Sequence, residues 1–182
     1  MAENAIRKIK WFWPWQDEKE EAWLRSMSQK GWHLSSVGLP CIYRFRAGEP
    51  QDYVYRLDYQ ALKKRDQQDY LQLFSDAGWE HLCQMSGWHY FRTEAIEGEA
   101  AEIFTDVESK VAKYKRLLIF LAFFVVIEAI CVAIFTHNIW GDYPYSWWGI
   151  IRVISLLVPL VMGALIYAII KLMLRIKQLR RL

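Results

Sequence analysis

The stretch LLIFLAFFVVIEAICVAIFT, Leu117 to Thr136, contains one charged residue, Glu128. A second apolar run extends from Trp147 to Leu174 and is interrupted by Arg152 and Lys171. A bilayer core about 30 Å thick is crossed by about 20 apolar residues that rise 1.5 Å each, and both runs reach that length. Buried helices of a soluble protein are the alternative, but they seldom stay apolar on every face over such a length. The two runs therefore predict a transmembrane helical hairpin.

Basic residues predict the orientation of this hairpin. They flank the two runs on their outer sides: Lys110, Lys113, Lys115, Arg116, Arg175, Lys177, Arg180 and Arg181. The connecting loop, His137 to Ser146, contains no Lys or Arg and is rich in Trp and Tyr, as an interfacial aromatic belt would be. By the positive-inside rule we expect a multi-pass protein of the bacterial cytoplasmic membrane with both termini in the cytoplasm.

Composition excludes several classes of protein. The formal net charge of +3 averages a mixed-charge N-terminal part with a basic membrane flank, so it does not indicate direct binding to nucleic acid. The three cysteines cannot all pair, and Cys131 falls within the first apolar run, so no disulfide framework is expected. The histidines and cysteines lack recognised zinc spacings, and we expect no metal site and no cofactor. No phosphate-binding loop, nucleophile elbow or metalloprotease motif occurs, which argues against an enzyme.

The N-terminal part shows a repeated pattern. The segments WLRSMSQKGW, Trp23 to Trp32, and YLQLFSDAGW, Tyr70 to Trp79, lie 47 positions apart, and each reads as a helix that ends at a glycine. Each is preceded by an aromatic-rich strand and followed by a hairpin, which gives two strand–helix–strand–strand units, about residues 6–47 and 53–93. We expect an α+β fold in which the two units form an antiparallel sheet with two helices.

These patterns together predict the domain organisation. A cytoplasmic α+β domain is expected over residues 1–94 and a juxtamembrane helix over 95–116. Transmembrane helices are expected over 117–136 and 147–174, with an external loop at 137–146 and a basic cytoplasmic tail at 175–182. The membrane part is thus predicted to anchor a soluble domain.

The segment KWFWPWQDEKEEAWLRSMSQKGWHL, followed by YRF and a second AGW unit, resembles the bacterial family known as domain of unknown function 2812. The resemblance covers about residues 8–92. It implies C-terminal membrane spans and a genomic neighbourhood that often contains PadR-type transcriptional regulators, but it carries over no catalytic residues. The tandem units also resemble GyrI-like effector-binding domains, in which aromatic residues and a carboxylate bind lipophilic cations; that likeness is one of architecture.

Aromatic residues are the most unusual feature of the soluble part. Trp11, Trp13 and Trp15 occupy alternate positions and are expected to share one face of a strand. Aromatic faces attract cations and line apolar pockets, although they also fill small cores, and the sequence leaves both roles open. The candidate ligand or partner site comprises Trp11, Trp13, Trp15, Tyr43, Tyr55, Trp88 and Tyr90.

Glu128 and Arg152 form a second candidate site, inside the predicted membrane. At 1.5 Å per residue the two lie at similar depths, so an intramembrane ion pair that fixes the hairpin is one interpretation. A polar contact from Glu128 to another membrane subunit, or a protonated Glu128, is the alternative.

Two functional hypotheses follow. The first is a membrane-anchored, non-enzymatic sensor or regulatory module that binds a small hydrophobic or cationic ligand or a cytosolic regulator, for example of the PadR type. The second is an accessory or scaffold subunit of a bacterial membrane complex. Homo-oligomerisation is compatible with both.

Overall fold

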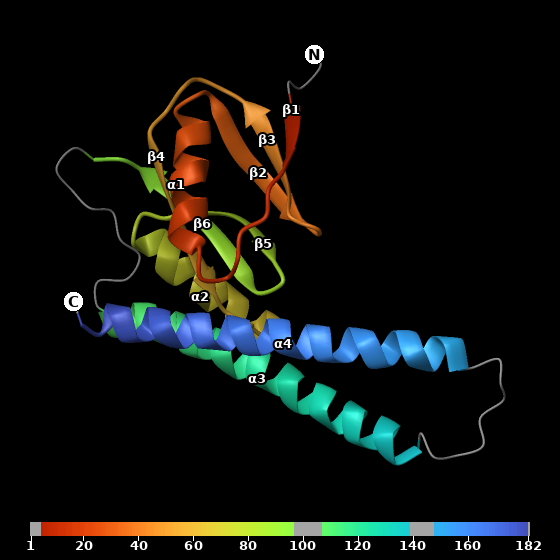
Figure 1. Ribbon diagram of the computed structural model, residues 1–182. Helices are drawn as coiled ribbons and strands as arrows, with labels where there is room; N and C mark the ends of the chain where they lie inside the picture. The colour runs from red at the N-terminus through yellow and green to blue at the C-terminus, as the bar shows by residue number, and fades with distance from the viewer. Residues whose placement is uncertain (1–4, 97–106, 139–147, 182) are drawn as a thin grey trace. The chain divides into compact units, whose positions relative to one another are not determined.

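The computed structural model describes residues 5–96, 107–138 and 148–181 (Figure 1). The chain divides into two compact units, residues 1–113 and 114–182. The strands are β1 (Ala5–Ile9), β2 (Trp32–Gly38), β3 (Ile42–Ala47), β4 (Tyr53–Tyr59), β5 (Glu80–Met85) and β6 (Trp88–Glu94). The helices are α1 (Asp17–Ser28), α2 (Lys64–Asp76), α3 (Val107–Asn138) and α4 (Trp148–Leu179).

The six strands form two antiparallel sheets with matching strand order. The first sheet is ordered β1-β3-β2 and the second β4-β6-β5, so the last strand of each strand–helix–strand–strand unit is central. One edge strand of each sheet has a shift in register, between Leu34 and Ser36 in β2 and between His81 and Cys83 in β5. These irregularities are 47 positions apart, as are the two Gly-Trp pairs. The predicted α+β class and element order are confirmed, but the strands form two sheets of three where one sheet was expected.

Glycines end helices α1 and α2 of the first unit. Gly31 follows α1 with a φ of 77°, and Gly78 follows α2 with a φ of 82°, a conformation that glycine adopts without steric cost. Helix α1 begins at Asp17. Gln16 occupies the cap position, and its side-chain oxygen accepts the backbone N–H of Trp13 at 3.1 Å and does not cap the helix.

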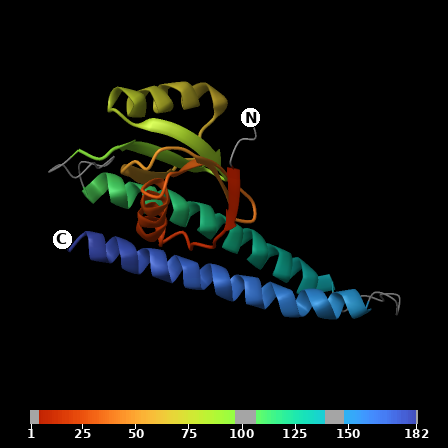
Figure 2. The ribbon, with the colours of Figure 1, turned by 90° about the horizontal axis from the view of Figure 1, so that it is seen from above.

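The core lies on both faces of the second sheet. On one face, Tyr55 and Tyr90 pack with α1 and with residues of β2 and β3 in one buried cluster. On the other face, Val54 and Phe91 pack with Phe74 of α2, which lies along this sheet in Figure 2. Neighbouring residues on a strand point to opposite faces of the sheet. Strands β4 and β6 therefore each contribute a residue to both clusters. The buried face of α1 thus packs against groups from both sheets.

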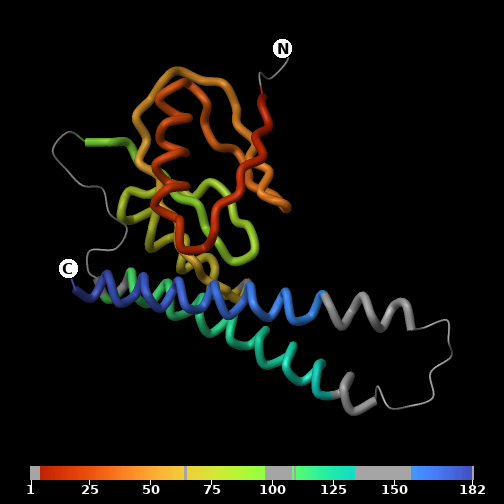
Figure 3. Tube along the Cα trace, in the orientation of Figure 1, coloured from red at the N-terminus to blue at the C-terminus, as the bar shows by residue number. Residues whose placement is uncertain are grey.

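Strand β1 is shorter than predicted. Its ladder with β3 extends from the Ala5–Arg46 pair to the Ile9–Ile42 pair, where β3 begins. Beyond Ile9 the backbone N–H of Lys10 donates to Cys41 O at 3.2 Å, and the chain then continues as an irregular segment to α1 (Figure 3). The expectation that three tryptophans share a strand face is therefore wrong, because all three lie in that irregular segment.

Helices α3 and α4 form an antiparallel hairpin in the second unit (Figures 1 and 2). Segments of 24 and 23 residues, Lys110–Ala133 and Leu157–Leu179, are long and apolar enough to cross a membrane by length and composition. Large apolar side chains on both helices are exposed, among them Ile119 at 72% and Leu160 at 69%. Exposure of this kind on long helices is typical of a surface that contacts lipid.

Candidate functional site

The first turns of α1 bury three carboxylates. Asp17, Glu20 and Glu21 are 2%, 7% and 8% exposed, and they lie on the same helical face as Leu24, which is fully buried. Residues three or four positions apart share a face of a helix, so the acids extend the apolar stripe of α1 into the domain interior. Acids in a first turn are ordinarily solvated and favoured by the helix dipole. Here each must find partners within the fold.

Glu20 is held by two tyrosines from the central strands of the two sheets. The hydroxyl of Tyr43 on β3 donates to Glu20 Oε1 at 2.7 Å, and that of Tyr90 on β6 donates to the same oxygen at 2.8 Å. Burial raises the pKa of Glu20 above its ordinary value, and the hydrogen bonds from the tyrosines oppose that rise. Burial and the neighbouring Glu20 also raise the pKa of both tyrosines, which therefore remain protonated donors.

Glu21 joins α1 to β4. Its Oε1 accepts the backbone N–H of Leu57 at 2.9 Å, and its Oε2 lies 3.4 Å from Arg56 Nη1. Burial raises the pKa of Glu21 to about 8, although the positive charges of Lys113 and Arg56 act in the opposite direction. The Glu21 carboxyl is therefore mostly protonated at neutral pH.

Asp17 joins α1 to the beginning of α3. The Nζ of Lys113 lies 2.5 Å from Asp17 Oδ2 and also donates to the backbone oxygen of Leu57 at 3.1 Å. Lys113 is 5% exposed, so the pair is removed from solvent on both sides. Buried pairs of this kind depend on full hydrogen bonding, and loss of one partner leaves a charge uncompensated.

A small cavity of about 60 Å³ adjoins this network. Its wall includes the carboxylates Asp17 and Glu20 and the aromatic rings of Phe12, Trp13, Tyr43, Trp88 and Tyr90, together with Pro14, Cys41 and Met85. Among the described residues, none of those that line the cavity is basic. A cavity of this measure holds a water once it offers about 10–15 Å³, so this cavity has room for only a few waters. Its chemistry is acidic and aromatic.

The predicted aromatic residues fall into three groups. Trp13, Tyr43, Trp88 and Tyr90 meet at this cavity. Trp11 and Trp15 are connected to it through Trp13, with ring centroids 5.5 Å and 5.2 Å away, and the Trp13 and Trp15 rings are stacked. Tyr55 does not line the cavity; it is 1% exposed within the core cluster.

The carboxylates of this site were missed by reasoning from sequence. Asp17, Glu20 and Glu21 were not selected as site residues from the sequence, because acids count as polar in a hydrophobic pattern. A usable signal existed, since all three have helical spacing with Leu24, the residue at the centre of the apolar stripe. Their tyrosine partners are distant in sequence, and no local pattern connects them.

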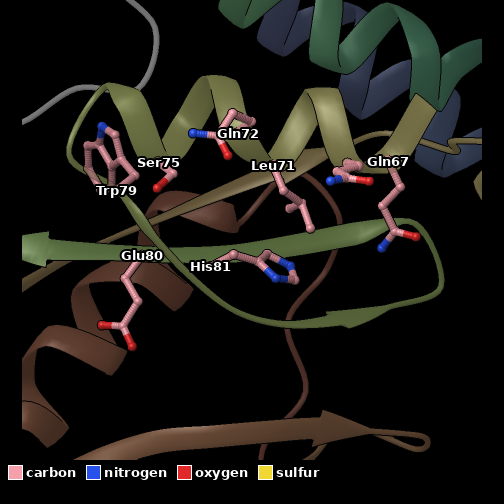
Figure 4. A pocket seen from close by; sticks show the side chains of 8 residues that line it. Gln67, Leu71, Gln72, Ser75, Trp79, Glu80 and His81 are labelled. Atoms are coloured by element: carbon pink, nitrogen blue, oxygen red, sulfur yellow. The ribbon is translucent and has the colours of Figure 1, made fainter. Parts of the chain in front are cut away.

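A second hollow lies between α2 and β5 and measures about 510 Å³ (Figure 4). It is lined by three glutamines of α2, Gln67, Gln68 and Gln72, with His81 on the strand side. His81 Nε2 lies 3.3 Å from Nδ1 of the fully buried His89. Burial lowers the pKa of both imidazoles, which keeps them neutral at neutral pH. Within the described residues, no group of three potential ligands could hold a metal ion. The carboxylate that lines this groove, Glu80, is exposed and pairs with Arg92 at 2.6 Å, unlike the buried Glu20.

The predicted Glu128–Arg152 pair lies partly outside the described residues. Glu128 is partly buried on α3, but the side chain of Arg152 belongs to the segment of α4 that is not described. The pair stays a prediction.

The fold and the cavity define a class: an α+β domain with a buried acidic and aromatic centre, continuous with an apolar helical hairpin. Residues 16–126 match the model of the family DUF2812, described as proteins of unknown function, and the chain belongs to this family. The match spans the buried acids, both tyrosines and Lys113, whereas Trp11, Trp13 and Trp15 precede it. No curated protein and no solved structure matches the chain.

Proposed function

We propose that this protein is a membrane-anchored, non-enzymatic sensor that binds a small organic cation at the Glu20 cavity. The observation that carries the proposal is a buried carboxylate whose two hydrogen-bond donors are neutral tyrosines, in a wall of aromatic rings. A buried carboxylate without a cation is costly, and its pKa rises until it takes up a proton or an opposite charge. An organic cation supplies that charge, and its alkyl groups contact the aromatic faces.

Trp13 is the entrance to this site in the proposal. At about 60 Å³ the cavity is too small for a drug-sized ligand, whose pockets are typically about 300–1,000 Å³. Trp13 is 43% exposed and lies in the irregular segment between β1 and α1, where no sheet ladder holds it. Displacement of its indole by the ligand would enlarge the cavity without breaking strand pairing.

In this proposal, the ion pair between Asp17 and Lys113 transmits ligand binding to α3. Asp17 lines the cavity, and its ion pair with Lys113 connects the cavity wall to α3, the helix that continues into the first apolar run. A cation near Glu20 would change the field at Asp17 and thus the strength of this pair, because charges in a low-dielectric interior interact strongly. A cytosolic regulator, for example of the PadR type, or a membrane partner would respond to the state of α3.

The proposal includes the placement of the hairpin. We infer that both apolar helices span the cytoplasmic membrane, with the termini inside, because basic residues flank the outer ends of the pair and the loop at 137–146 has none. A cysteine introduced as Asp142→Cys should then react with an impermeant maleimide in intact cells, above the background of the native cysteines. Labelling only after the membrane is opened would contradict this orientation.

The test of binding uses full-length protein in detergent with tetramethylammonium and the bulkier benzyltrimethylammonium as probes. We expect tryptophan fluorescence to change and calorimetry to give a saturable isotherm. Glu20→Gln keeps the shape and the hydrogen-bond acceptor but removes the charge, and should weaken binding at least tenfold. The matched control is Glu18→Gln, which removes the same charge from an exposed position in the same turn. Equal binding by both variants would refute the site.

The output is tested by hydrogen exchange in the first turns of α3. We expect the probe cation to change the exchange of residues 107–113 in the wild-type chain. The double variant Asp17→Asn/Lys113→Met replaces the ion pair without leaving one charge buried, and it should still bind the cation but lose the exchange response in α3. An unchanged response would show that the signal does not pass through this pair.

A further inference from the structure

A groove in the second unit combines a basic end with an apolar end. The first part of α3 and the last part of α4 run side by side (Figures 1 and 2). The groove is lined by residues of both helices and measures about 660 Å³. Its basic residues are Lys115, Lys177, Arg180 and Arg181, all exposed. Among the described residues, none of those that line the groove is acidic. Four positive charges without a compensating acid make this a site for an anion.

On both helices the residues that line the groove change from apolar to basic toward the same end of the hairpin. On α4 it proceeds from Ile170 and Met173 to Lys177, Arg180 and Arg181, a distance of about 16 Å at 1.5 Å per residue. On α3 it proceeds in the opposite chain direction, from Lys115 to Leu118. Because the helices are antiparallel, both basic ends coincide and both apolar parts lead into the apolar runs.

We propose that this groove binds an anionic phospholipid of the cytoplasmic leaflet, with the phosphate among the basic residues and an acyl chain along the apolar part. The inference rests on the proposed membrane insertion of the hairpin but not on the Glu20 site. A free phosphate would use only the basic end. A second copy of this chain would bring the same four cations to the interface, and charge complementarity therefore favours the lipid.

Lys171 shows that not every cation of α4 belongs to this site. Its Nζ lies 5.5 Å from the ring centroid of Tyr167 on its own helix, and it is not among the residues that line the groove. Six positions separate it from Lys177, which places the two on different faces of an α-helix. Lys171→Gln is therefore the matched control for Lys177→Gln, because both remove one charge from the same end of α4.

The experiment is native mass spectrometry of the full-length chain released from nanodiscs that contain equal amounts of phosphatidylglycerol and phosphatidylcholine. We expect one phosphatidylglycerol to be retained in preference to phosphatidylcholine. Lys177→Gln should reduce its retention about fivefold, and Arg180→Gln/Arg181→Gln about 25-fold, as each cation near an anionic surface contributes roughly a factor of five. Lys171→Gln should leave retention unchanged.

A bulky substitution that fills the groove tests whether its apolar end contacts an acyl chain. Met173→Trp should reduce retention of phosphatidylglycerol without any change in charge. Equal retention of both lipids, an equal effect of Lys171→Gln, or full displacement by millimolar inorganic phosphate would overturn the proposal. A lipid-free dimer that Arg180→Gln/Arg181→Gln strengthens would overturn it in favour of a second copy. Failure of the chain to enter nanodiscs would overturn both this inference and the proposed membrane insertion, whereas the Glu20 site would be unaffected.

Discussion

Replacement of Tyr90 by Phe tests the central feature of the first unit, the hydrogen bond that the Tyr90 hydroxyl donates to Glu20 Oε1 at 2.8 Å. The ring remains, so packing is nearly preserved and the change is confined to one donor. A hydrogen bond to a charged acceptor contributes about 1.5–3 kcal/mol, whereas one between neutral groups contributes about 1 kcal/mol. If Glu20 is ionised, Tyr90→Phe should therefore reduce the free energy of unfolding by about 2 kcal/mol.

A double-mutant cycle with Glu20→Gln separates this bond from other effects. Glutamine still offers a carbonyl oxygen to Tyr90 but carries no charge, so Tyr90→Phe should cost only about 1 kcal/mol in that background. The difference, on the order of 1 kcal/mol, is the coupling between the hydroxyl and the negative charge. Tyr43→Phe provides the matched comparison, because its hydroxyl donates to the same oxygen at 2.7 Å from the other sheet.

The coupling also has a pH dependence with a defined sign. Burial raises the pKa of Glu20, and the tyrosine hydroxyls partly oppose that rise. Removal of one hydroxyl raises the pKa further, so Tyr90→Phe should cost most where Glu20 is ionised and least at low pH, where the carboxyl is protonated in both proteins. A coupling of about 1.4 kcal/mol would correspond to one pKa unit.

The assay is native-state hydrogen exchange of the full-length protein in detergent. The slowest amides of β3 and β6 report opening of the whole soluble unit, and their free energies of opening are compared at pH 5 and pH 8 after correction for intrinsic exchange rates. An equal cost of Tyr90→Phe in both backgrounds and at both pH values would show that Glu20 does not act as a charged acceptor, and the argument for a cation site would fail with it.

Three other predictions use the same assay. Burial raises the pKa of Glu21 from 4.5 to about 8, so the free energy of unfolding should fall by up to about 1.4 kcal/mol per pH unit as pH rises from 4.5 to 8. Glu21→Gln should flatten this slope. An unchanged slope would contradict the raised pKa of Glu21. Gly78→Ala should cost about 1 kcal/mol through its positive φ alone, since nothing lies within 4 Å of the added Cβ. Gly31→Ala should cost at least about 1 kcal/mol more, because its Cβ would lie 2.6 Å from a backbone oxygen of the neighbouring loop; equal costs would show that the loop yields freely. Lys113→Met should cost about 3–5 kcal/mol by removing the ammonium group that faces the buried Asp17, and a smaller loss would indicate that water reaches the carboxylate.

The order of elements was predictable because the responsible forces are local. Gly31 and Gly78 end the helices through backbone conformation, and alternation of apolar residues identifies β4 over its full length, Tyr53–Tyr59. The sheets were harder, because irregularities in β2 and β5 change which residues face each other. The end of β1 at Ile9 could not be inferred from its own residues; it is set by the position at which β3 begins.

The site itself was predictable only in part. Aromatic residues pointed to Trp13, Tyr43, Trp88 and Tyr90, and these do meet. The acid among them was not anticipated, since a hydrophobic pattern treats glutamate as a solvated residue and cannot show that tyrosines 23 and 70 positions away supply its donors. Long-range polar contacts of this kind are decided by tertiary packing, which a local pattern does not record.

The charge balance around α1 indicates why these acids are a feature of function more than of stability. Of the three buried acids, Asp17 pairs with Lys113, and Glu21, whose pKa burial raises to about 8, lies beside Arg56. Apolar residues of similar size would often be as stable as buried charges, so the charges add no obvious stability. Glu20 accepts its two described hydrogen bonds from neutral tyrosines and faces the aromatic cavity. Among the described residues that line this cavity none is basic, so a proton or a bound cation would supply the positive charge that Glu20 lacks there.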